Sequence, residues 1–324
     1  MKKTIPVISL TAVLFLAGCS PHFHLDFLGR DSIEEVVLQD SRSKNKICVI
    51  DISGVISSSP ESGLFAREGD LLSRIYYRLL KAADDPLVKG VVLRLDTPGG
   101  EVTASDIIYN EILKFRKKTG LPVVALAMGT AASGGYYIAS ACDYFMVHPS
   151  TITGSIGVIS IYPNISDLLE KLGIEMKVIK SGARKDSSSL FREMTEEDRK
   201  IFQAVIDEMY LKFLDVVYSA RRDHLSRIEL EELADGRIYT ASQALEAKLV
   251  DGIGYVDEAL DHVKSLASIS DAKVITYTYF PKSKTNIYAS ALKQPSLFDL
   301  SELKQVLPSL KSGFYYLWLP STAR

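Results

Sequence analysis

Short apolar segments alternate with longer amphipathic ones through the first half of the chain. Residues 46–56 (KICVIDISGVI), 90–95 and 122–128 are rich in Val, Ile and Leu, which predicts three strands. Residues 69–83 and 102–117 repeat apolar side chains at helical spacing, which predicts two helices between them. Parallel strands need such crossovers, so the alternation predicts an α/β protein with a mostly parallel sheet.

The pattern continues toward the C-terminus. A helix is predicted over 133–141, and a long helix over 195–221 whose first residue, Thr195, forms a capping box with Asp198. Its apolar stripe is Phe202, Val205, Met209, Phe213 and Val216. Further strands are predicted at 144–147, 176–179 and 273–280.

The N-terminus has the form of an export signal. Lys2 and Lys3 precede the apolar run 5–16, which is short for a membrane span and ends in Leu-Ala-Gly-Cys. That ending resembles the bacterial lipoprotein box, which implies cleavage before Cys19 and a lipid on Cys19. The alternatives are an ordinary signal peptide or an uncleaved anchor. Cys48 and Cys142 each lie in an apolar run and are expected to be buried.

Charge and metal-ligand patterns exclude several classes of protein. The net charge of −2 and the pI of about 6.3 give no basic footprint for nucleic acid, so no nucleic-acid partner is expected. The three cysteines form no Cys-x-x-Cys pair, and the five histidines show no ligand spacing in a plausible core. No metal site and no cofactor are therefore expected.

Two glycine-rich corners each follow a predicted strand and open a predicted helix. They are Asp-Thr-Pro-Gly-Gly-Glu at 96–101 and Gly-Thr-Ala-Ala-Ser-Gly-Gly at 129–135. Open α/β sheets place their sites at such strand ends, and paired backbone N–H groups can stabilise an oxyanion. Either corner alone is a weak signal of a site, because glycine is common in α/β turns and Ala/Gly runs often indicate close helix packing.

Ser133 in the second corner is a candidate nucleophile, and a nucleophilic serine needs a base. His148 is one candidate, and Lys180 and Lys185 in the segment Lys-Ser-Gly-Ala-Arg-Lys-Asp are two others. A lysine base must be neutral, so its surroundings must lower its ordinary pKa of ~10.4. Residue types alone leave the choice open.

Five motifs in order resemble the signal peptide peptidase A family of serine proteases, which have the Clp-protease/crotonase fold. They are TPGG, AASGGYYIAS, TGSIGV, KSGARKD and GRIYTASQALEAKLVDGIG, and the resemblance covers about residues 46–266. It implies Ser133 as nucleophile, Lys185 as base, Ser155 as the residue that orients the lysine, and the N–H groups of Gly100 and Gly134 as oxyanion donors.

The N-terminal signal with its lipoprotein box and the resemblance to the peptidase family together imply a domain organisation and a location. The expected domains are a signal peptide at 1–18, a tether at 19–45, a Ser-Lys peptidase domain at 46–270 and a C-terminal extension at 271–324. The expected protein is a lipid-anchored endopeptidase on the exported side of a bacterial cell envelope. Its expected substrates are cleaved signal peptides or other apolar peptides, and it is expected to form a homo-oligomeric ring.

Three other functions remain open at this stage. They are a Clp-like Ser-His protease that uses His148, a crotonase-like acyl-CoA enzyme, and an inactive binding lipoprotein. The aromatic segment 313–320 is expected to pack against the body of the protein or a neighbouring subunit, with the membrane interface as the alternative.

Overall fold

The structure, a computed structural model, describes residues 33–58, 71–278, 287 and 313–318. The chain divides into two units, Met1–Ile33 and Glu34–Arg324, and the second contains the elements discussed below. The predicted signal peptide and Cys19 lie outside the described residues.

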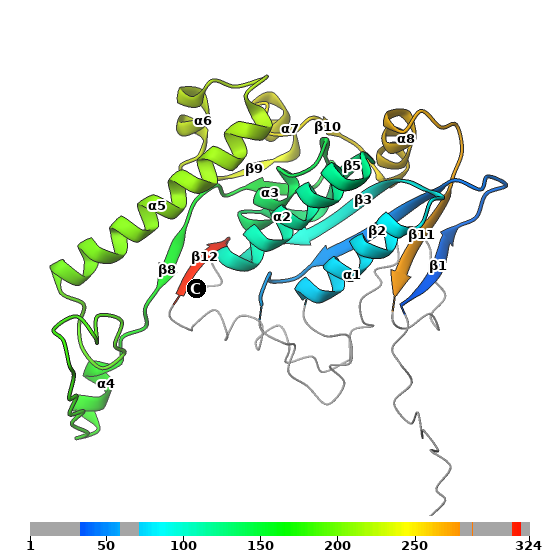
Figure 1. The fold of residues 1–324 in the computed structure, drawn as a ribbon. Coiled ribbons are helices and arrows are strands. Elements are labelled where there is room, and N and C mark those ends of the chain that lie inside the picture. The colour runs from blue at the N-terminus through cyan, green and yellow to red at the C-terminus, as the bar shows by residue number, and fades with distance from the viewer. Residues whose placement is uncertain (1–32, 59–70, 279–286, 288–312, 319–324) are drawn as a thin grey trace, which may run out of the picture. The chain divides into compact units, whose positions relative to one another are not determined.

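The main sheet is mostly parallel. Its strands are β1 (Glu34–Gln39), β2 (Lys46–Ser53), β3 (Val88–Thr97), β5 (Val123–Ala132), β6 (Tyr144–Val147), β7 (Ile152–Gly154), β9 (Ile238–Thr240), β10 (Gly252–Ile253) and β11 (Lys273–Thr278). Among the described residues they run in the order β1–β11–β2–β3–β5–β6–β10, and β7 pairs with both β5 and β9 (Figure 1). Only the β1–β11 and β7–β9 pairs of this sheet are antiparallel. The predicted α/β fold with a mostly parallel sheet is confirmed.

Helices cover both faces of this sheet. The helices of the described residues are α1 (Leu71–Asp84), α2 (Val102–Thr119), α3 (Gly134–Ala139), α4 (Ser166–Lys171), α5 (Glu196–Arg221), α6 (Arg227–Leu233), α7 (Ala241–Glu246) and α8 (Val256–Leu266). Helix α8 packs on β3 and β5 through a cluster that includes Val92, Val124 and Leu126. Successive strand residues point to opposite faces, so buried neighbours such as Leu93 and Ala125 face the layer of α1, α2 and α3.

Strand β5 pairs with two different strands along its length. Its first half pairs with β6 from Val124 to Ala127, and its second half pairs with β7 from Thr130 to Ala132. The strand therefore extends beyond the body of the sheet before the chain turns into α3. This extension carries the Ala-Ala-Ser-Gly-Gly corner.

A second, three-stranded sheet lies beside this corner. It consists of β4 (Gly99–Glu101), β12 (Gly313–Leu317) and β8 (Ile159–Ile161), with β12 in the centre and antiparallel to both neighbours (Figure 1). The described part of the aromatic C-terminal segment thus packs against the body of the chain, which was one of the expected outcomes.

Two expected elements differ from the structure. The segment predicted as a tether, 19–45, contains the strand β1. This strand forms because β11, from the other end of the chain, provides a sheet edge with which its backbone can pair. The strand predicted at 176–179 is wrong: these residues are irregular and exposed, because no described strand lies beside them to pair with their backbone. Sequence alternation alone cannot show whether an apolar segment has a partner.

Residues 162–195, which we call the arm, connect β8 to α5 and contain α4. Figure 1 shows α4 beyond the N-terminal end of α5, away from α3. Asp198 ties the arm to α5: its buried carboxylate accepts hydrogen bonds from the Ser187 hydroxyl (2.7 Å) and the Arg192 guanidinium (2.9 Å). These bonds, with those from Thr195, hold the pKa of Asp198 well below its usual range.

Replacing Asp198 should loosen the arm. Asp198→Asn removes the charge that Arg192 and Ser187 surround, so protease cleavage within residues 182–195 should be faster at neutral pH. Limited proteolysis with mass-spectrometric mapping measures this. Glu196→Gln is the matched control, because Glu196 is an exposed acidic residue of the same first helical turn. Equal cleavage of the two variants would contradict the anchoring role.

Candidate active site

Ser133 lies in a strained turn between β5 and α3. Its backbone has φ 52° and ψ −110°, and it is the residue immediately before the first turn of α3. Its N–H donates to the carbonyl of Gly154 (2.8 Å), and its side chain is almost completely buried, at 1% exposure. The long β5 strand and its bond to the end of β7 thus fix the position of this hydroxyl-bearing residue.

Ser155 lies next to Ser133, one residue beyond the end of β7. Ala132 of β5 pairs with Gly154 of β7, so the two serines follow paired residues of neighbouring strands. Ser155 also has a positive φ, 50°, and its N–H donates to the carbonyl of Arg237 (2.8 Å).

Positive φ is itself informative at these two positions. Among the described residues, four non-glycine residues have positive φ, and two of them are Ser133 and Ser155. Such conformations cost on the order of 1–3 kcal/mol each and cluster at functional sites. The strain therefore supports a functional role for both serines independently of their sequence motifs.

The two glycine corners meet at the start of α3. A Cβ atom added to Gly99, which has φ +96°, would lie 2.7 Å from the backbone nitrogen of Gly134. Thr97 holds the first corner in shape, because its hydroxyl accepts the Gly99 N–H (3.0 Å) and donates to the Gly54 carbonyl (2.6 Å). The structure therefore brings the predicted donors Gly100 and Gly134 into adjacent turns.

The peptide groups of β4 also fix where Gly100 points. The N–H of Ile56 donates to Gly99 (2.8 Å), and the Ile56 carbonyl accepts from Glu101 (2.8 Å). Because peptide groups alternate along a strand, the N–H of Gly100 faces the other way, toward β12. Tyr316 of β12 is its register partner.

The carbonyl oxygen of Tyr316 occupies the space between the corners. It lies 2.0 Å from the position of a Cβ on Gly99 and 3.2 Å from that of a Cβ on Gly134. Only glycine permits so close an approach. A peptide carbonyl thus lies against the two corners that carry the predicted oxyanion donors. Sequence reasoning did not place Tyr316 here; the aromatic run at 314–318 was its only signal.

Lys185 is not brought to Ser133 within the chain. Lys185 lies in the arm, which precedes the first residue of α5, Glu196. Helix α5 contacts α3 through Phe213, whose ring packs against Tyr137. About 25 Å of helix separates Glu196 from Phe213, so the arm lies far from α3 and Ser133. Within the described residues the exposed Lys185 ammonium has no ion pair. The backbone N–H of Lys185 donates to the Gly182 carbonyl (3.2 Å).

The other two candidate bases are engaged elsewhere. Lys180 forms an ion pair with Asp186 (2.7 Å) in the arm. The backbone N–H of His148 donates to the carbonyl of Ala127 in β5. Ala127 precedes Ser133 by six residues, which places it roughly 20 Å from Ser133 along the strand. The His148 ring contacts Ser150 (2.8 Å) and the ring of Tyr255. The geometry disfavours both residues as the base of Ser133.

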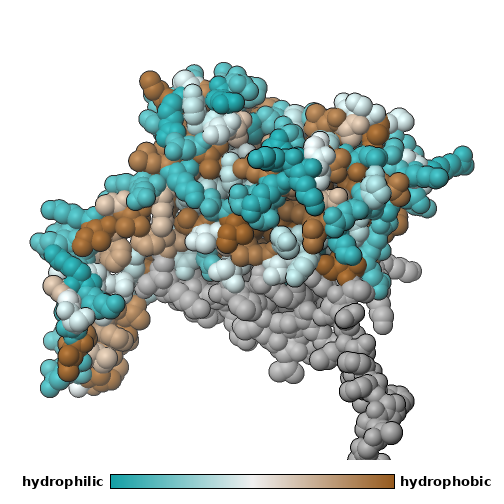
Figure 2. All heavy atoms as spheres, viewed as in Figure 1, coloured by the Kyte–Doolittle hydropathy of each residue, from teal (hydrophilic) through white to brown (hydrophobic). Residues whose placement is uncertain are grey.

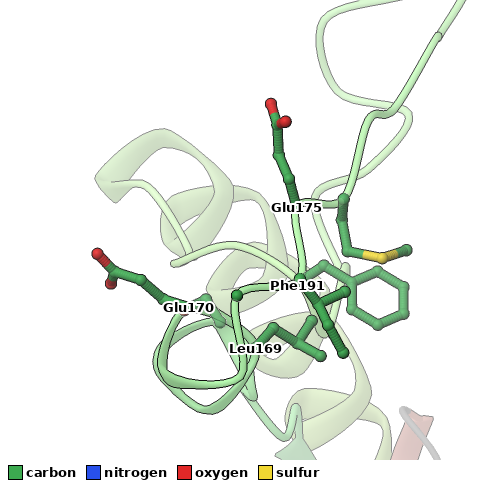
Figure 3. A pocket seen from close by; sticks show the side chains of 8 residues that line it. Leu169, Glu170, Glu175 and Phe191 are labelled. Atoms are coloured by element: carbon green, nitrogen blue, oxygen red, sulfur yellow. The ribbon is translucent and has the colours of Figure 1, made fainter.

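The arm carries a shallow pocket and many exposed apolar side chains. In Figure 3, Leu169 and Phe191 line the pocket, and the carboxylates of Glu170 and Glu175 point away from it. The hydrophobic surface of the arm is visible in Figure 2. Its exposed apolar residues are Leu168, Leu172, Ile174, Met176, Val178, Ile179 and Phe191.

The described residues lack two further features, a metal-binding cluster and a membrane-spanning helix. No group of three or more His, Cys, Asp or Glu side chains is placed to hold a metal ion there. No helix in that part of the chain has both the length and the apolar character needed to cross a membrane.

The packing of the corners makes a prediction. A Cβ on Gly134 would lie 2.5 Å from the Ser105 hydroxyl, which is a rotatable group. Gly134→Ala should therefore destabilise the protein by about 1–3 kcal/mol. Thermal unfolding of Gly134→Ala, Ser105→Ala and the double variant measures this, because Ser105→Ala alone removes the hydrogen bond from the Ser105 hydroxyl to the Glu101 carbonyl (3.0 Å). The double variant should lose less stability than the sum of the two single losses, and a loss equal to that sum would contradict the packing.

The fold is that of Clp-protease-like enzymes, and the sequence of residues 68–152 matches the family model of the Clp proteases. The model of peptidase family S49 matches residues 115–270, which include Ser133, Ser155 and Lys185.

Similar proteins point to the same family. A protein of Enterococcus faecium named as a signal peptide peptidase SppA is 40% identical over 265 residues, 82% of this chain and 75% of that protein. Protease 4 of Haemophilus influenzae is 36% identical over 69% of this chain, which spans 35% of that protein. The chloroplastic serine protease SPPA of Arabidopsis thaliana is 27% identical over 81% of this chain and 38% of its own length. The chain belongs to peptidase family S49 and is a serine peptidase.

Proposed function

We propose that this peptidase is an endopeptidase that uses Ser133 as nucleophile and Lys185 as general base. The observation that carries the proposal is the peptide carbonyl of Tyr316, which lies against Gly99 and against Gly134, the residue that follows the strained Ser133. A substrate carbonyl at the same place would be open to attack by the Ser133 hydroxyl. The N–H groups of Gly100 and Gly134 would then stabilise the oxyanion.

The proposed reaction has two halves. Ser133 Oγ attacks the carbonyl carbon while Lys185 Nζ takes the hydroxyl proton. The C–N bond then breaks, and Lys185 returns the proton to the leaving amine. Water, activated by the same lysine, hydrolyses the resulting ester. The Ser155 hydroxyl, beside Ser133, would accept a hydrogen bond from Lys185 and orient it.

Lys185 would have to come from a second copy of the chain. The arm holds it away from its own Ser133, and the exposed apolar side chains of the arm give this segment a surface to bury. An assembly in which each arm reaches the neighbouring Ser133 would complete every site. A closed ring satisfies this arrangement with one repeated interface.

Complementation tests both the dyad and its origin. Ser133→Ala and Lys185→Ala should each lower hydrolysis of an apolar peptide at least ~100-fold, because each removes a group needed for attack. Co-expression of the two differently tagged variants should restore about one quarter of the wild-type activity, the fraction of neighbouring pairs that supply both groups. Circular dichroism and sizing should show that both variants fold and assemble.

Two outcomes would count against this proposal. Full activity of a folded Ser133→Ala protein would refute Ser133 as nucleophile. Mixed assemblies that stay inactive, although each variant assembles, would place both groups of a site in one copy.

We propose apolar peptides, including cleaved signal peptides, as substrates. Strand β12 pairs with β4 on one edge and on the other with β8, which carries Ile159 and Ile161. An extended substrate in the place of β12 would be bound mainly through its backbone. The name of the Enterococcus relative supports the signal-peptide class.

Membrane anchoring through Cys19 is part of the same proposal. A lipid on Cys19 would hold the enzyme on the exported side of the cell envelope, where cleaved signal peptides are found. A single acyl chain binds a membrane only marginally, so stable attachment needs more than one. Cys19→Ser should move the protein from the detergent-soluble membrane fraction to the soluble fraction. An unmodified Cys19 in the intact mass of the wild type would contradict this.

A further inference from the structure

A short turn at residues 235–237 lies beside the strained Ser155. The carbonyl of Arg237 accepts the Ser155 N–H (2.8 Å). The next part of the same loop also meets the turn, because a Cβ on Gly157 would lie 3.5 Å from the Gly236 Cα atom. The loop that follows β7 therefore rests on a turn that lies far from it in the sequence.

Asp235 closes this turn with its carboxylate. One oxygen accepts hydrogen bonds from the backbone N–H of Arg237 (3.0 Å) and from the Arg237 Nε atom (2.8 Å), and the other accepts from a terminal nitrogen of the same guanidinium. Gly236, between the two residues, has φ +92°, a conformation that L side chains rarely adopt. A carboxylate that binds the backbone two residues further on forms an Asx turn. Asp235 thus restrains the residue whose carbonyl binds Ser155.

Strand β9 connects the turn to the end of β7. Its first residue, Ile238, is the register partner of Gly154 in an antiparallel pair. Tyr239 packs closely on the same glycine, since a Cβ on Gly154 would lie 2.5 Å from its ring, and its hydroxyl donates to the Leu233 carbonyl (2.6 Å). On the other edge of β7, the Gly154 carbonyl accepts the Ser133 N–H (2.8 Å). The end of β7 is therefore held between the turn and Ser133.

The backbone strain at Ser155 makes this support necessary. Ser155 has φ 50°, and such a conformation persists only where the surrounding structure holds it. Without the bond to the Arg237 carbonyl, the Ser155 peptide group could relax and carry its hydroxyl away from the neighbouring Ser133. A displacement of about 1 Å near reacting groups can cost ~100-fold in rate.

The turn itself contributes little to the core of the protein. The side chains of Asp235 and Arg237 are 46% and 60% exposed, and exposed ion pairs add little to global stability. A Cβ on Gly236 would meet nothing within 4 Å. The Arg237 guanidinium and backbone N–H lower the pKa of Asp235 to about 2, so its carboxylate is ionised at neutral pH. The effect of the turn is therefore concentrated on the loop after β7.

We propose that Asp235 is a positioning residue that acts through the Arg237 carbonyl to hold Ser155 where its hydroxyl orients the lysine base. The catalytic half of this inference rests on the proposed function, since it takes Ser155 as the partner of Lys185. The other half, that Asp235 restrains the Ser155 backbone, concerns the folded chain alone.

Hydrogen exchange tests the restraint on Ser155 without any assay of activity. The full chain carrying Asp235→Ala is compared with Asp223→Ala, a matched control at an exposed aspartate between α5 and α6. Mass spectrometry of fragments that contain Ser155 should show its amide exchanging at least ~10-fold faster in Asp235→Ala, because local opening becomes easier. The control should exchange at the wild-type rate, and both variants should unfold near the wild-type temperature.

Steady-state hydrolysis of a capped apolar peptide tests the positioning role. Asp235→Ala should lower kcat about 10- to 100-fold with little change in KM, because the base is misplaced while β4 and β8 are unaltered. Asp235→Asn keeps an acceptor for the Arg237 N–H and should stay within about 3-fold of the wild type. Gly236→Ala, which is strained at φ +92° but meets no neighbour, should reproduce the loss with the carboxylate intact.

The outcomes separate this inference from the proposed function. Unchanged exchange of the Ser155 amide in Asp235→Ala would overturn the restraint, and equal kinetic losses in Asp235→Ala and Asp223→Ala would overturn its specificity. Faster exchange with wild-type kcat would overturn the catalytic half while leaving Ser133-dependent hydrolysis intact. A fully active Ser133→Ala protein would refute the proposed mechanism, and the exchange rates would still decide whether Asp235 holds Ser155.

Discussion

The close approach of two backbone turns is the constraint on which the site depends. Gly99 and Gly134 come so near each other that a Cβ on Gly99 would lie 2.7 Å from the Gly134 nitrogen, and the Tyr316 carbonyl lies against both turns. The approach is possible because β3 and β5 are parallel neighbours, so their carboxyl ends emerge at the same edge of the sheet. Sheet topology thus creates the place where a peptide carbonyl can be bound.

Strand β5 adds the second requirement, a serine held in an unfavourable backbone conformation. Pairing with β7 carries β5 past the end of β6, and the bond from Ser133 to Gly154 holds the turn. The adjacent Ser155 is strained in the same way. Two strained serines side by side are explained more simply by a chemical task than by packing, because packing alone would favour glycine at both positions.

Local sequence signals predicted the elements whose partners are nearby in the chain. The strand at 46–56, the helix at 102–117 and the capping box of Thr195 and Asp198 are all present. The predicted placement of Ser133, Ser155, Gly100 and Gly134 in one region agrees with the geometry, although their catalytic roles remain a proposal. Long-range pairing was beyond local reasoning, since β1 and β12 depend on partners far away in sequence. The role of the arm was equally beyond local reasoning. Lys185 and the exposed apolar residues around it do not reach Ser133 within one chain, and no local signal in the sequence shows this.

The central claim is that Ser133 is a nucleophile activated by Lys185. Labelling with a serine-reactive fluorophosphonate, followed by peptide mapping, tests it most directly. The account predicts a single adduct on Ser133, with labelling lost in Lys185→Ala and retained in Lys180→Ala, whose lysine is paired with Asp186 in the arm. An adduct on another residue, or undiminished labelling of Ser133 in an assembled Lys185→Ala protein, would contradict it.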